Sequence, residues 1–338
     1  MSSTPPPATP SSIEGLVLPW PDEGKPWDGQ PMARIGLRME FFFQGQSAPA
    51  RRALLEIVEQ YAAAAGGALR RYIVEGDRRH RTLAPGQALD LSRLRDRVDK
   101  PDADWAIDLS AEPGIQHPSH WSLATLASAR GTLLLHFPLS AFEQSAPGTF
   151  RGLFARWCRA LEVSHAYAGL GFVLPVEVGN NDAALRRIGP WAQRFVGLDT
   201  DLAATTALWC RDGIRCINWL TAVNGTWLER AGGAAGVLAG AGAAVTALDY
   251  GRGSIFVAGA SPQIGDASVG QVPADYVALG AALKPLRAAY PSTIFNAPPG
   301  YHVPDGYTAQ LGWSAAKPHE LADALYAQRW LARFDGAA

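Results

Sequence analysis

The stretch DGIRCINWLTAVNGTWLERAGG, residues 212–233, carries the clearest local signals for the fold. Within it, the side chains of residues 214–221 alternate at the two-residue period of a β-strand. Asn224 and Gly225 predict the end of this strand, because both residue types tolerate positive backbone φ. Thr226 is expected to cap a short helix, with a glutamate three residues later completing a capping box and a glycine pair ending the helix. The stretch therefore predicts a strand, a turn and a helix, and it contains no recognisable catalytic group.

Outward from this stretch, the chain mixes strand-like and helix-like segments in both directions. Strands are predicted at residues 34–43, 70–75, 105–109, 122–128, 132–137, 167–176, 245–248 and 255–258. Helices are predicted at residues 49–65, 150–163, 180–195, 274–283 and 318–334, with Gly189-Pro190 kinking or splitting the third. Residues 122–137 and 245–258 each predict a hairpin. Hairpins mixed with helices favour an α+β fold over a doubly wound sheet, so we expect two packed lobes of mixed, largely antiparallel sheet with flanking helices.

The length of 338 residues exceeds the usual size of one hydrophobic core. We expect a flexible Pro-rich leader at residues 1–31, an N-terminal α+β lobe at residues 32–145 and a C-terminal α+β lobe at residues 146–338. One continuous domain is the alternative. The leader lacks the basic region and apolar core of a secretory signal, which favours a cytoplasmic protein.

The composition is that of a soluble globular protein, with 48% hydrophobic and 18% charged residues. A formal net charge of -1 gives no overall attraction to nucleic acid or anionic lipid, so we expect neither as a direct partner. Residues 231–248 contain no ionisable side chain, but alanine and glycine dominate, which favours a buried helix and a strand over a membrane span. Cys158, Cys210 and Cys216 are too few and too unevenly spaced for a disulfide framework and fit reduced thiols.

Motifs for cofactors and metals are weak. The segment GAGAAV, residues 240–245, lacks the third glycine of a dinucleotide loop and precedes a predicted strand instead of following one. His117 and His120 could offer two imidazoles to a metal, but no further ligands stand at fitting spacing. We therefore expect no cofactor and no metal.

Two histidines leave an enzyme hypothesis open. His136 and His165 each border an apolar strand, where a lone histidine is more often a hydrogen-bonded core residue than a general base. A hydrolase with a histidine-based site between the lobes remains the alternative function. It requires an imidazole within hydrogen-bond reach of a nucleophile or an acid.

Acidic residues form two groups along the chain. The first lies in the middle of the N-terminal lobe and includes Asp102, Asp104 and Asp108. The second, smaller group consists of Asp199, Asp201 and Asp212. Such loops are either simply solvated or form a binding surface, and the sequence leaves both interpretations open.

Several segments taken together resemble one known family. They are HAYAGLGFVLP at residues 165–175, RFVGLDTD at residues 194–201 and the stretch at residues 212–233, with SPQIGD at residues 261–266 and RWLARFD at residues 329–335 also similar. In their order these segments resemble the bacterial type VI secretion immunity family, which is TsiV-like and was formerly a domain of unknown function. The resemblance covers most of the chain from about Ile35 onward and excludes the Pro-rich leader and the Ala/Gly-rich residues 231–244.

The resemblance implies a cytoplasmic immunity protein that binds and neutralises a cognate secreted toxin, for some members a VRR-Nuc type DNase. Such a protein covers the active site or substrate channel of the toxin and needs a complementary surface but no nucleophile of its own. A basic DNA groove on the toxin would favour acidic contacts, so both acidic groups are candidate toxin-binding residues, with Trp105 or Trp209 as an aromatic anchor. An adaptor that loads the toxin for export is a further alternative.

Overall fold

An eleven-stranded sheet forms the centre of the computed structural model, which describes residues 16–100, 105–144, 147–200, 203–288, 294–304 and 318–335. The strand order is β10-β11-β9-β8-β2-β7-β6-β5-β3-β4, and β1 also pairs with β2. All strand pairs are antiparallel. The strands are β1 (Val17–Pro19), β2 (Pro31–Phe43), β3 (Arg71–Val74), β4 (Arg81–Thr82), β5 (Ala106–Ser110), β6 (Ser122–Leu126), β7 (Gly131–Phe137), β8 (His165–Val173), β9 (Leu220–Asn224), β10 (Val245–Asp249) and β11 (Gly253–Ala258). Helices and antiparallel strands together confirm the α+β fold.

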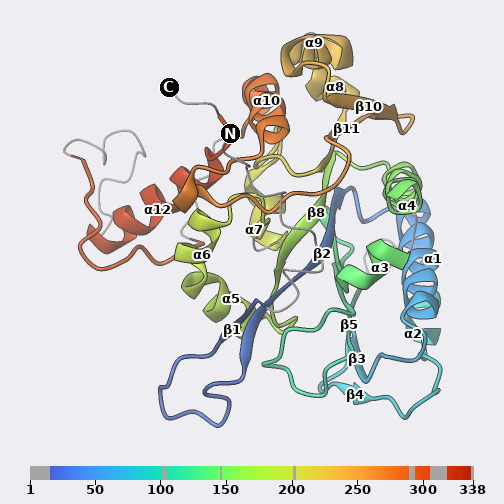
Figure 1. Cartoon of the computed structure of the whole chain (residues 1–338). Coiled ribbons are helices and arrows are strands. Elements are labelled where there is room, and N and C mark those ends of the chain that lie inside the picture. Colours follow the sequence, from blue (N-terminus) through green and yellow to red (C-terminus); the bar gives the residue numbers. More distant parts are fainter. Residues whose placement is uncertain are drawn as a thin grey trace.

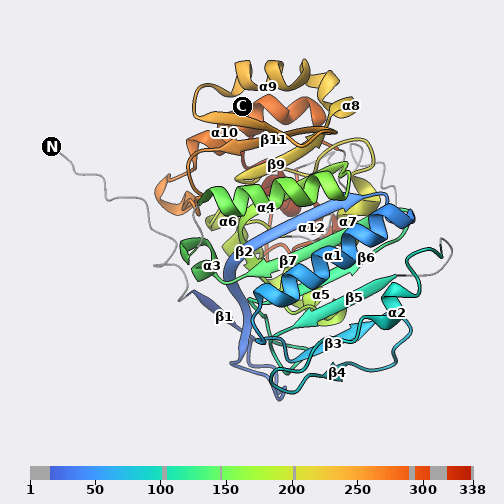
Figure 2. The ribbon, with the colours of Figure 1, turned by 90° about the vertical axis from the view of Figure 1, so that its right-hand side faces the viewer.

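Helices cover both faces of this sheet (Figure 1). Helices α1 and α4 lie on one face, and α5, α6 and α12 lie on the other, as the rotated view also shows (Figure 2). The helices are α1 (Ala48–Ala64), α2 (Ser92–Arg95), α3 (Leu139–Gln144), α4 (Pro147–Ala160), α5 (Val178–Arg187), α6 (Gly189–Arg194), α7 (Ala203–Trp209), α8 (Gly225–Leu228), α9 (Gly233–Ala241), α10 (Ala274–Leu283) and α12 (Pro318–Leu331). The central strands β2, β7 and β8 are therefore buried between two helical layers.

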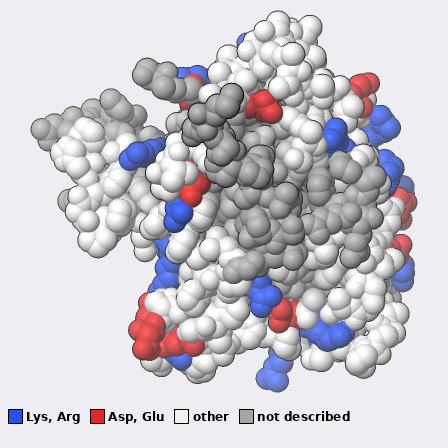
Figure 3. All heavy atoms as spheres, in the orientation of Figure 1, with Lys and Arg blue, Asp and Glu red and all other residues white. Residues whose placement is uncertain are grey.

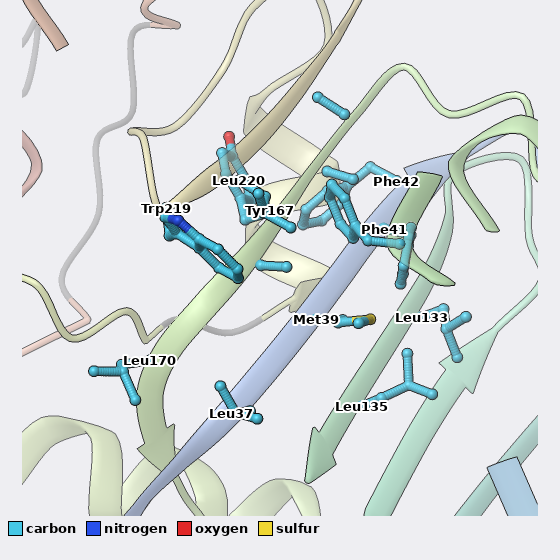
Figure 4. Close-up of a cluster of buried hydrophobic side chains, with 14 of the residues drawn as sticks. Leu37, Met39, Phe41, Phe42, Leu133, Leu135, Tyr167, Leu170, Trp219 and Leu220 are labelled. Atoms are coloured by element: carbon cyan, nitrogen blue, oxygen red, sulfur yellow. The ribbon is translucent and has the colours of Figure 1, made fainter. Parts of the chain in front are cut away.

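Strand β2 lies in the middle of the sheet. It pairs with β7 on one side and with β8 on the other, so its backbone is hydrogen-bonded along both edges. Figure 4 shows Met39 and Phe41 of β2 beside Leu133 and Leu135 of β7 in the core. Because β8 follows residue 146 in the chain, the sheet continues across the expected boundary between the lobes. The division into two lobes stays a prediction, and this continuity favours the alternative of one domain.

Several local predictions are confirmed. The hairpins β6-β7 and β10-β11 form as expected, and the helix predicted at residues 180–195 divides into α5 and α6 at Gly189. Residues 231–248 form α9 followed by β10. Within the described ranges, every helix is too short or too polar to cross a bilayer. The leader predicted to be flexible contains β1, which pairs with β2, while its first 15 residues lie outside the described residues.

The predicted strand at residues 214–221 is wrong over most of its length. Strand β9 begins only at Leu220, and residues 215–219 are irregular. The cause is local hydrogen bonding: the side chain of Asn218 accepts from the backbone N–H of Trp219, and Thr221 Oγ1 accepts from the backbone N–H of Asn218. Such side-chain contacts compete with the hydrogen bonds of a sheet.

The helix after β9 begins two residues earlier than predicted. Asn224, not Thr226, caps α8, because its Oδ1 accepts from the backbone N–H of Trp227 at 2.9 Å. Gly232 then adopts a φ of 76°, in the left-handed region that favours glycine, and ends the following 3₁₀ turn as expected. The glycine stop was predicted correctly, whereas the cap was not.

Candidate functional site

The predicted acidic residue Asp199 lies in the interior of the protein. Its side chain is fully buried and its Oδ1 accepts from Nη1 of Arg215 at 2.9 Å. The same guanidinium donates through Nη2 to Glu40 Oε2 at 3.1 Å, and both of these partners are also fully buried. The second acidic group is therefore not one exposed patch.

Electrostatics explain why this carboxylate can stay charged in the core. Burial alone would raise the pKa of Asp199, but the charges of Arg215 and Arg38 outweigh that effect and lower its pKa. A buried and paired carboxylate is a structural group, so the interpretation of Asp199 as an exposed toxin contact is corrected.

The remaining candidates divide by position. Trp105 is fully buried and its Nε1 donates to the carbonyl of Leu94 at 3.1 Å, which corrects the proposal that it is a surface anchor. Asp108 on β5 is partly buried, and burial raises its pKa to about 7 although the charge of Arg71 opposes this shift. Asp102, Asp104 and Asp201 lie outside the described residues. Trp209, with 44% of its surface exposed, and Asp212, three positions later in the chain, are both exposed.

Exposed acids gather at a different place on the molecule. Figure 3 shows acidic side chains together at the lower left, over the loop between β1 and β2. That loop contains Asp22, Glu23 and Asp28. Glu23 pairs with Arg187 at 2.7 Å, and Asp28 accepts from backbone N–H groups of its own loop. These acids are at least partly satisfied within the chain.

The histidines of the hydrolase alternative each lie beside a serine. Nδ1 of His136 is 3.0 Å from Oγ of Ser122, and Nδ1 of His165 is 3.1 Å from Oγ of Ser164. Burial lowers the pKa of both imidazoles, that of His165 to about 3, so both are neutral at pH 7. Distance alone would therefore permit a histidine-serine pair.

The direction of the hydrogen bonds opposes that interpretation. Ser122 Oγ donates to the carbonyl of Ser119 at 2.8 Å, and Ser164 Oγ donates to the carbonyl of Phe42 at 3.0 Å. A hydroxyl has one proton, so while each serine donates to its carbonyl, the imidazole Nδ1 is the donor to the serine. A general base would have to accept the proton of the serine. Neither pair has the polarity that hydrolysis requires.

The geometry also does not favour a metal site at His117 and His120. Nε2 of His120 donates to the carbonyl of Ile35 at 3.0 Å, and Nε2 of His117 contacts the side chain of Gln30. In the part of the chain that the structure describes, no three His, Cys, Asp or Glu residues are grouped to hold a metal ion. His120 instead joins its loop to β2, and His117 joins its loop to the loop between β1 and β2.

An open cleft with a volume of about 540 Å³ lies where the end of β2 meets the start of β8, the end of β9 and helix α7. His165 is part of its lining, and the imidazole stacks on Phe42 with ring centroids 4.3 Å apart and lies 5.4 Å from Trp227. Nε2 of His165 is buried and has no hydrogen-bond partner among the described residues. We refer to this feature as the α7 cleft.

Three arginines contribute to the lining of the α7 cleft: Arg130, Arg211 and Arg252. Arg252 pairs with Glu162, the one acidic residue of the described lining. Arg130 follows β6 in the hairpin turn and Arg211 follows α7, some 80 positions later, so no local sequence pattern connects them. This basic site was not predictable from the sequence, because only the tertiary structure brings the two residues together.

The model of the TsiV family, described as type VI immunity for VRR-NUC, matches residues 53–302. The chain belongs to the TsiV family. This type VI immunity protein is also similar to the solved structure of Pseudomonas aeruginosa T6SS protein PA0821, with 23% identity, a TM-score of 0.70, and coverage of 91% of this chain and 85% of that one. This similarity shows that the two proteins share a fold over 91% of this chain. Among curated proteins, none matches the chain.

Proposed function

We propose that the protein neutralises a cognate VRR-Nuc toxin by forming a stoichiometric complex that covers the active site or substrate channel of the toxin. The observation that carries this proposal is the match of the immunity family over residues 53–302. The polarity of the two histidine-serine pairs supports it, because neither pair offers a general base to a nucleophile. Protection would then come from occupancy of the toxin and not from turnover.

The physical demands on such an inhibitor are high, because each free toxin molecule can cut DNA repeatedly. A complex of this kind is expected to bury roughly 1,600 Å² or more. Its dissociation constant should be nanomolar or lower, equivalent to about -12 kcal/mol. Since DNA is the target of a nuclease, the protein must act in the compartment that holds the DNA, and we propose the cytoplasm.

The decisive experiment is a titration of the purified cognate toxin with this protein while DNA cleavage is measured. Occupancy predicts that residual cleavage falls linearly and reaches its minimum near one equivalent. Protection by a small fraction of an equivalent would show turnover and overturn the proposal.

A His136→Gln protein tests the enzyme alternative at the histidine of the two that does not line the α7 cleft. Under the proposal it protects at the same equivalence point once its folding has been checked by circular dichroism. Expression of the toxin in cells that lack the secretion system separates immunity from adaptor action, since an adaptor for loading gives no protection there.

A further inference from the structure

The α7 cleft carries positive charge that the described carboxylates neutralise only in part. The ion pair of Arg252 with Glu162 leaves Arg130 and Arg211 without a carboxylate partner among the described residues. Both of these arginines are exposed. Asp212 is exposed next to Arg211 in the chain but is not part of the cleft lining.

The two arginines converge on one point of the backbone. Nη1 of Arg130 donates to the carbonyl of Leu208 at 3.5 Å, and Nε of Arg211 donates to the same oxygen at 2.9 Å. Two cations held this close repel one another unless an anion lies between them. A single carboxylate placed beside that carbonyl is within reach of both guanidinium groups, which bind carboxylates with paired N–H donors.

An apolar ledge adjoins these charges. Leu208 and Trp209 are both 44% exposed, and they belong to the turn of chain that supplies Ala207, Cys210 and Arg211 to the lining. Exposed tryptophan beside arginine is the combination enriched at the energetic centres of protein interfaces. The cleft thus combines a concave surface, an aromatic side chain and uncompensated charge of one sign.

We propose that the α7 cleft receives an acidic segment of the toxin, with a toxin carboxylate between Arg130 and Arg211 and an apolar toxin side chain against Leu208 and Trp209. This inference rests on the proposed function and names the surface that performs it. The occupant is a protein segment because the cleft joins an apolar ledge to its charges, a combination that free anions do not require. The contact reverses the charge pattern expected from the sequence, in which this protein supplied the acids.

The test measures the dissociation constant of the purified toxin for three proteins by biolayer interferometry. Arg130→Glu combined with Arg211→Glu should weaken binding by at least about 100-fold, mainly through a faster off-rate. Thr226→Trp, which places a large side chain in the lining without a change of charge, should weaken binding by about tenfold or more. The matched control, Arg78→Glu combined with Arg79→Glu, alters the same charge at exposed positions before β4, at the far edge of the sheet, and should stay within about threefold of wild type.

Thermal melting of each protein shows whether its fold is intact. Thr226→Trp keeps the proposal testable if the double charge reversal does not fold. Binding within about threefold of wild type for every folded cleft variant would overturn the α7 cleft as the docking surface. A wild-type protein that neither binds the toxin nor blocks cleavage would instead overturn the proposed function, so the two failures are distinguishable.

Discussion

The two faces of strand β2 are buried by different kinds of interaction. On one face, Phe41 packs against Phe154 and Trp157 of α4, with ring centroids 5.2 Å and 6.1 Å apart. On the other face, Arg38 and Glu40 form an ion pair at 3.0 Å that is almost completely buried. The two-residue period of a strand sends adjacent side chains to opposite sides, so a single segment builds both environments.

The difference lies in what each face specifies. Apolar contacts are non-directional, and many combinations of similar volume satisfy them. The charged face requires particular partners, because Glu40, Asp199 and Arg215 come from three separate segments and must meet within hydrogen-bond distance. We expect substitutions on the apolar face to lower the free energy of unfolding by graded amounts. Substitutions that remove a partner on the charged face should lower it sharply.

The largest expected effect follows removal of the shared cation. Arg215→Met removes the cation that Asp199 and Glu40 share, which leaves Glu40 with Arg38 and Asp199 with the more distant Arg333, and should lower the free energy of unfolding by about 3–5 kcal/mol, measured by urea denaturation. A compensated protein that also carries Asp199→Asn and Glu40→Gln should recover part of this loss. A loss under about 1 kcal/mol for the single variant would contradict the idea that these charges need one another.

The apolar face gives a smaller and graded response. Leu54 of α1 is completely buried, so Leu54→Ala should cost about 2–5 kcal/mol through lost contacts and the cavity left behind. Its neighbour Leu55 is only partly buried and provides the control, because Leu55→Ala on the same helix should cost clearly less. Equal losses at the two positions would show that α1 does not cover the sheet as described.

The charged face should also be sensitive to acid. Burial and the charge of Arg215 lower the pKa of His165 from 6.5 to about 3. The unfolded chain therefore binds a proton first, and the stability that depends on neutral His165 is lost as the pH falls from 6.5 toward 3. As the pH falls, the free energy of unfolding of His165→Gln should decrease less steeply than that of the wild type, by about 1 kcal/mol per pH unit. Each protein is compared with its own value at neutral pH. The exposed His302→Gln should keep the wild-type slope.

The smallest effect is expected where an ion pair is exposed. Arg52 and Asp99 lie 2.5 Å apart, with 58% and 74% of their side chains exposed. Arg52→Met should change the free energy of unfolding by less than about 1 kcal/mol, because water already solvates both charges. A loss similar to that of Arg215→Met would remove the contrast between buried and exposed pairs.

The same contrast extends to the α7 cleft. The interior arginine Arg215 pairs with carboxylates of the chain, whereas among the described residues Arg130 and Arg211 at the surface contact no carboxylate and share a backbone carbonyl. An arginine paired inside the chain has a structural role, and an arginine left without a carboxylate at a cleft is available to another molecule. Burial and pairing together thus separate the structural charges from the candidate binding charges.

The sequence by itself determined the α+β class, the two hairpins and the division of α5 from α6, because these depend on side-chain periodicity and on glycine and proline over a few neighbouring positions. The order of the resembling segments also led to the immunity family, which the family model confirms over residues 53–302. Only the tertiary structure decided that Asp199 is an interior ion-pair partner and that Arg130 lies beside Arg211. Burial and charge pairing depend on contacts between residues distant in the chain, and local sequence patterns carry no record of those contacts.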